Sequence, residues 1–119
     1  MTQIQATALS VLMEAPVALG LVYGLAPQLR RRLPAVVAVA AAATLVTHPF
    51  AWALSIQLTP LLGYVPAVFV VEAAVVAVEA AFYRRFLGLG RGHALLVSTL
   101  ANATSVAGGY LIYWLEGTL

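Results

Sequence analysis

Four long apolar runs, separated by short polar segments, occupy nearly the whole of this 119-residue chain. A helix of about 20 residues rises about 30 Å, which is the thickness of the hydrocarbon core of a bilayer. The runs cover about residues 4–25, 35–57, 65–87 and 94–115. The sequence therefore predicts an all-α membrane protein, in which a bundle of four transmembrane helices forms a single transmembrane domain over residues 1–119.

The composition supports a multi-pass membrane protein. The chain is 63% hydrophobic and 8% charged, too few charged residues to cover the surface of a soluble domain. No basic residue precedes the first run and Glu14 lies within it, so it is not a secretory signal. Without cysteine the chain has no disulfide, thiolate metal ligand or cysteine nucleophile. We expect an integral protein of a prokaryotic cytoplasmic membrane, with the lipid bilayer as its surroundings and no nucleic-acid partner.

The basic residues predict the orientation. All six are arginines, and they occupy two segments: Arg30, Arg31 and Arg32 after the first run, and Arg84, Arg85 and Arg91 around the turn between the third and fourth. The segment between the second and third runs has no charge, nor do the first thirteen residues. Short arginine-rich loops stay in the cytoplasm. The prediction is therefore N-out and C-out, with both arginine segments inside.

Polar side chains recur near the middle of all four predicted spans. They are Glu14 in the first, His48 in the second, Glu72 and Glu79 in the third, and Asn102 in the fourth. An acidic residue at the centre of a helix in lipid costs roughly 2.5 to 3.5 kcal/mol. Glu72 and Glu79 are seven residues apart and share a helix face. We therefore expect these side chains to face one another inside the bundle or across a dimer interface.

Carboxylates and an imidazole at mid-membrane are ligands for a cation or a proton. We take Glu14, His48, Glu72, Glu79 and Asn102 as candidate cation- or proton-binding residues of a small transport protein. One alternative is an intramembrane metal-dependent enzyme, with His48, Glu14 and Glu72 as ligands of a divalent metal ion. Another is a structural subunit of a larger membrane complex. Four thin helices leave little room for an aqueous path, so we expect a homo-oligomer or a partner in a membrane complex.

Each candidate also has a purely structural interpretation. Glu79 lies nearer the inner end of its helix and could pair with Arg84 or Arg85. His48 could be a neutral histidine satisfied by a neighbour in the core. Asn102 is typical of a residue that joins two helices through hydrogen bonds.

The layout of four short spans with a glutamate midway along the first resembles the small multidrug resistance transporters. In that family the residue matched by Glu14 binds drug cations and protons in a dimer. The resemblance is one of layout, because the family's glutamate-flanking and third-span patterns are missing here. Separately, "VEAAVVAVEA", residues 71–80, is similar to the Glu-x6-Glu helix of bacterial diacylglycerol kinase, without the asparagine between its glutamates. Neither resemblance assigns a family.

Overall fold

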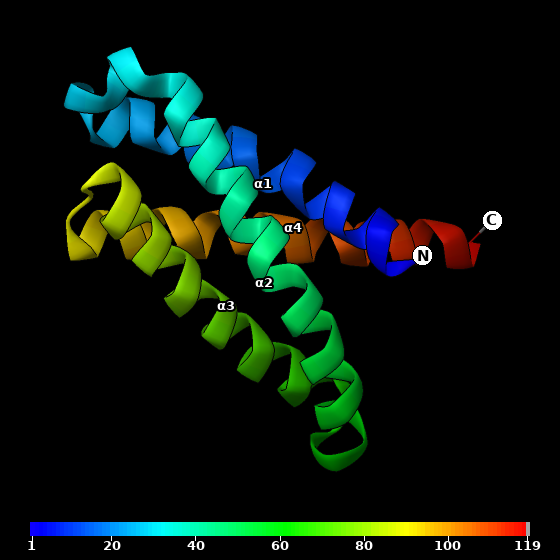
Figure 1. The fold of residues 1–119 in the computed structure, drawn as a ribbon. Helices are drawn as coiled ribbons and strands as arrows, with labels where there is room; N and C mark the ends of the chain where they lie inside the picture. Colours follow the sequence, from blue (N-terminus) through cyan, green and yellow to red (C-terminus); the bar gives the residue numbers. More distant parts are fainter. Residues whose placement is uncertain (119) are drawn as a thin grey trace.

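The computed structural model describes residues 1–118 as a bundle of helices (Figure 1). The elements are α1 (Gln3–Leu25), the 3-10 helix η1 (Pro27–Arg32), α2 (Leu33–Leu62), α3 (Tyr64–Leu87) and α4 (Arg91–Thr118). Within the described part of the chain, four helices are long and apolar enough to cross a membrane. The predicted all-α four-helix bundle is confirmed, and its length and composition are those of a multi-pass membrane protein.

The helices pack in a ring, α1 beside α2, α2 beside α3, α3 beside α4, and α4 beside α1. At one end, which we call the arginine end, η1 lies near the turn between α3 and α4 (Figure 1). At the other, the splayed end, the turn between α2 and α3 diverges from the two chain termini (Figure 1). The molecule measures 44 × 30 × 20 Å, and because α2 and α3 diverge from α1 and α4 towards the splayed end, its shape is that of a wedge (Figure 1).

The apolar core lies at the arginine end. Its members include Ala18, Val22, Val36, Ala40, Ala80, Tyr83, Leu87 and Val97. Alanine is frequent in this cluster, and small side chains let helix backbones approach closely. Large apolar side chains elsewhere, such as Phe50, Phe69 and Trp114, are exposed on the outside of the bundle. The bundle is therefore closed by packing at the arginine end.

The turn between α2 and α3 is shorter than the sequence suggests. The second predicted span ends at about residue 57, whereas α2 continues to Leu62 and contains Pro60 in its last turn. Gly63 alone separates the two helices; its φ of 83° favours glycine, and its N–H donates to the Thr59 carbonyl at 2.9 Å. Pro60 cannot donate to the Ile56 carbonyl four residues earlier, so α2 loses one hydrogen bond there and continues for only two more residues before it ends.

Candidate functional site

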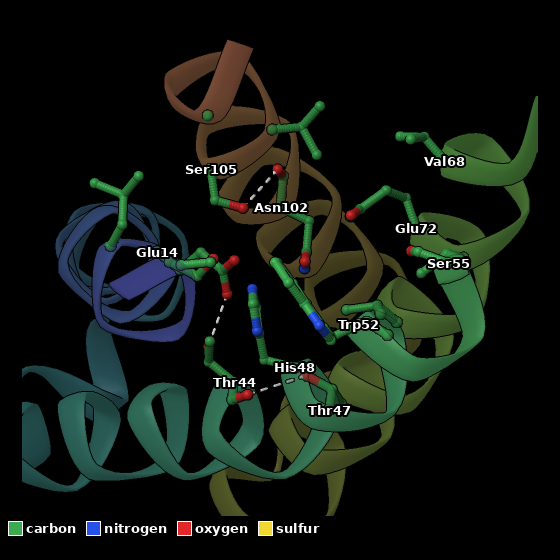
Figure 2. Close-up of a pocket in the computed structure, with 18 of the residues that line it drawn as sticks. Glu14, Thr44, Thr47, His48, Trp52, Ser55, Val68, Glu72, Asn102 and Ser105 are labelled. Atoms are coloured by element: carbon green, nitrogen blue, oxygen red, sulfur yellow. Dashed lines mark hydrogen bonds between the residues drawn. The ribbon is translucent and has the colours of Figure 1, made fainter. Parts of the chain in front are cut away.

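A cavity of about 480 Å³ lies between the four helices, in the half of the bundle nearer the splayed end (Figure 2). All five candidates from the sequence line it: Glu14, His48, Glu72, Glu79 and Asn102. The structure thus brings side chains from four different helices to one space, as the shared depth of these residues predicts.

The floor of the cavity is polar. On each helix, the lining residue nearest the arginine end carries a polar side chain: Glu14 on α1, Thr44 on α2, Glu79 on α3 and Asn102 on α4. One turn further towards the arginine end, each of these helices presents a buried side chain: Ala18, Ala40, Tyr83 and Ser98, respectively. The cavity therefore ends at a polar layer that rests directly on the packed core.

Glu79 is the most buried of the candidates, with 1% of its surface exposed. Thr47 Oγ1 lies 2.7 Å from its Oε1, and Asn102 Nδ2 donates to its Oε2 at 2.7 Å. The structure does not support the structural alternative in which Glu79 pairs with Arg84 or Arg85. Both arginines are exposed, and residues five and six positions along a helix point away from the face that Glu79 occupies.

Glu14 is also buried, with 3% of its surface exposed. The hydroxyl of Thr44 lies 2.7 Å from its Oε2 and 3.1 Å from the carbonyl of Ala40, one turn back on α2. This contact joins α1 to α2 at the floor. Ser105 of α4 lines the same part of the cavity and lies across from Glu14 (Figure 2).

Glu72 differs from the other two carboxylates. Its side chain points into the cavity from α3, and its Oε2 is buried but has no hydrogen-bond partner within residues 1–118 (Figure 2). The described lining residues include no arginine. A carboxylate oxygen that is shielded from solvent and lacks a donor is unfavourable, so this position requires a proton, a water molecule or a cation.

His48 is held at the wall of the cavity by a contact from α1. Its Nδ1 lies 2.9 Å from the hydroxyl of Thr7, and Thr7 also donates to the Gln3 carbonyl at 2.8 Å. Within residues 1–118, no group of three His, Cys, Asp or Glu side chains is placed to hold a metal ion. The three ligands predicted for a divalent metal ion, Glu14, His48 and Glu72, are therefore not placed around one ion in the described part of the chain. Thr44 contacts Glu14 and Thr7 contacts His48 instead.

Aromatic side chains surround the mouth of the cavity. Trp52, Tyr64, Tyr110 and Tyr113 all line it towards the splayed end. The rings of Tyr64 and Tyr110 meet edge-on, with centroids 6.2 Å apart, and so connect α3 to α4 where the backbones separate. A ligand that enters from the splayed end passes these rings before it reaches the carboxylates.

Several residues of the site are not candidates from the sequence. Thr44, Thr47 and Thr7 supply hydroxyl groups to Glu14, Glu79 and His48, respectively. Threonines are common in membrane helices, where their hydroxyls satisfy backbone carbonyls one turn back, so their presence alone is a weak signal. The common depth of Thr44 and Thr47 with Glu14 and Glu79 is the feature that could have identified them, and Thr7 shares a face of its helix with Glu14.

Comparison with protein-family models, with curated proteins and with solved structures gives no match to this chain. Inference about function therefore depends on the residues of the cavity and on their chemistry.

Proposed function

We propose that the protein binds a small cation in this cavity and transports it across the membrane, with Glu14 and Glu72 in contact with the ion. The observation that carries the proposal is the buried Oε2 of Glu72, which has no donor within the described residues. Leaving a buried acceptor unsatisfied costs about 1–3 kcal/mol, and more for a charged group. A bound cation removes that cost, and the neighbouring carboxylates of Glu14 and Glu79 add to the attraction.

The size and lining of the cavity favour an organic ammonium ion over a bare metal ion. Its volume of about 480 Å³ is in the range of small-molecule pockets. The described residues offer no three-ligand set of the kind that a transition metal prefers. Aromatic rings at the mouth, among them Trp52 and Tyr64, attract cations by about 0.5 to 2 kcal/mol when suitably placed.

The wedge shape suits a carrier. The cavity extends towards the splayed end, and the core around Val22, Val36 and Val97 closes the arginine end. A site that is accessible from one side at a time is what alternating access requires. With the arginine end in the cytoplasm, as the arginine placement predicts, this cavity would face outwards.

The proposal is tested by ligand binding to purified protein in lipid nanodiscs, with tetraethylammonium as the probe and isothermal titration calorimetry as the measurement. We expect Glu72→Gln to weaken binding roughly tenfold or more, which corresponds to about 1.4 kcal/mol. Glu116→Gln is the matched control, because Glu116 is exposed near the end of α4 and should not affect the affinity. Equal affinities for the wild type and Glu72→Gln would contradict the proposal. Uptake of the probe by proteoliposomes then tests transport.

A further inference from the structure

The amide of Asn102 identifies which oxygen of Glu79 can carry a proton. Asn102 Nδ2 donates to the Ser98 carbonyl at 2.9 Å and to Glu79 Oε2 at 2.7 Å. A backbone carbonyl can only accept, so the contact with Ser98 fixes the orientation of the amide. Asn102 therefore donates to Oε2 whether Glu79 is neutral or ionised. A proton on Glu79 has its place on Oε1, the oxygen that faces Thr47.

The hydroxyl of Thr47 can serve Glu79 in both protonation states. Thr47 Oγ1 lies 2.7 Å from Glu79 Oε1 and 3.0 Å from the Ala43 carbonyl, and it has one hydrogen to donate. When Glu79 is ionised, that hydrogen is donated to Oε1. When Glu79 is neutral, the hydrogen on Oε1 is donated to Thr47, and Thr47 donates to Ala43. No hydrogen-bonding group loses its partner in the exchange.

We propose that Glu79 stores a proton and releases it when a cation binds, so that the protein exchanges protons for cations. This proposal rests on the cation site proposed above. The step breaks the O–H bond at Oε1 of Glu79, leaves the electron pair on the carboxylate and passes the proton to water in the cavity. Thr47 turns its hydroxyl from the Ala43 carbonyl to Oε1. A third negative charge beside Glu14 and Glu72 is unfavourable in the empty cavity and becomes favourable beside a bound cation.

Other titratable groups face the same space and could supply the proton instead. They are Glu14 on α1, His48 on α2, Glu72 and Tyr64 on α3, and Tyr110 and Tyr113 on α4. Tyr83, one turn from Glu79 on α3, is buried in the core below the cavity. Glu14 has a comparable hydroxyl partner, because Thr44 lies 2.7 Å from its Oε2 and 3.1 Å from the Ala40 carbonyl. Glu79 differs from it in that the amide of Asn102 also donates to its second oxygen, in an orientation fixed by the Ser98 carbonyl. Glu72 lacks such partners within the described residues, which suits a ligand of the cation rather than a proton store.

Proton release is measured by calorimetric titration of tetraethylammonium at pH 7 in two buffers of different ionisation enthalpy. We expect the wild type to release about one proton per cation, and its affinity to fall roughly tenfold per pH unit below the release range. Glu79→Gln is isosteric with the neutral acid and can donate to Thr47 while accepting from Asn102. It should bind the probe and release no proton. Unchanged release in Glu79→Gln would overturn the proposal.

A second pair of variants tests the role of Thr47 as a positioning residue. Thr47→Val removes the donor on which the ionised form depends, so proton release at pH 7 should fall and reappear at higher pH. Thr47→Ser keeps the hydroxyl and should restore the wild-type pH profile. Identical profiles for Thr47→Val and the wild type would mean that the hydroxyl does not take part.

Infrared spectroscopy separates this inference from the cation site itself. If the wild type fails to bind tetraethylammonium, the proposed function is contradicted, but the proton on Glu79 remains measurable without any ligand. We expect a carboxylic acid C=O band at neutral pH whose intensity falls in Glu79→Gln and is unchanged in Glu14→Gln; any intensity that remains in Glu79→Gln belongs to a proton on Glu72. A band that is unchanged in Glu79→Gln would refute a proton on this residue.

Discussion

The ring of Tyr64 meets the ring of Tyr110 edge-on, with an angle of 85° between their planes. Tyr64 begins α3 and Tyr110 lies in the second half of α4, so the contact spans the widening gap at the splayed end. The contact joins α3 to α4 through side chains beside the mouth of the cavity.

The Tyr64–Tyr110 contact should hold α3 and α4 together at the splayed end. A double-mutant cycle of Tyr64→Ala and Tyr110→Ala should give a coupling energy of about 0.5–1.5 kcal/mol in stability, the usual range for an aromatic pair. Tyr64→Phe keeps the ring and should retain most of that coupling. Denaturation in mixed detergent micelles measures the effect. Strictly additive losses from the two alanine variants would show that the rings stabilise nothing together.

The contact between Thr7 and His48 predicts a tautomer. The Thr7 hydroxyl donates to the Gln3 carbonyl at 2.8 Å, so the 2.9 Å contact with Nδ1 is best satisfied by a hydrogen on Nδ1. Neutral His48 then presents an unprotonated Nε2 as a hydrogen-bond acceptor. Nitrogen NMR of labelled histidine checks this, and His93, exposed in the first turn of α4, provides the second signal for comparison. A signal from a hydrogen on Nε2, lost in Thr7→Val, would reverse the assignment.

Close packing beside the floor of the cavity predicts that the same substitution at two neighbouring alanines changes the free energy of unfolding by very different amounts. Ala43 is fully buried, whereas Ala42 faces outwards. Ala43→Leu should destabilise the bundle by about 1–3 kcal/mol, the usual cost of overpacking. Ala42→Leu adds an apolar side chain to an outward face and should be nearly neutral. The two free energies of unfolding, measured under identical conditions, decide it; similar values would mean that α2 is rotated relative to the structure.

The orientation of the protein in the membrane is a separate prediction, based on the positions of the arginines. A periplasmic reporter such as alkaline phosphatase should be active when fused after Leu119 and inactive when inserted at Gly90. A cytoplasmic reporter such as green fluorescent protein should behave in the opposite way. The reverse pattern would place the arginine end outside and turn the cavity towards the cytoplasm.

Hydropathy was sufficient to predict the four helices, because crossing a bilayer demands long apolar runs and little else. The end of α2 was not predictable in the same way. Pro60 is typical of a helix end, yet the helix continues to Leu62 and turns at Gly63. The turn depends on a positive φ at one glycine, which a hydropathy profile does not reveal.

The shared depth of Glu14, His48, Glu72, Glu79 and Asn102 predicts that they meet, and in the structure they line one cavity. The burial and the hydrogen-bond partners of each side chain could not be predicted from the sequence. Helix periodicity places Glu72 and Glu79 on one face, but the divergence of α3 buries Glu79 and leaves Glu72 half-buried. That difference arises from the angle between helices, which the spacing of residues along one helix does not contain.

The one-residue turn at Gly63 has a consequence for the insertion of the protein into the membrane during its synthesis. A nascent chain emerges from the ribosome with α2 and α3 adjacent, before Asn102 of α4 has been synthesised. Alone, α3 would carry two glutamates into lipid at a cost of roughly 5 to 7 kcal/mol. The contact between Thr47 and Glu79 lies wholly within this hairpin, so one of those acids already has a partner. We therefore expect α2 and α3 to leave the translocation channel together, as a single unit of membrane integration.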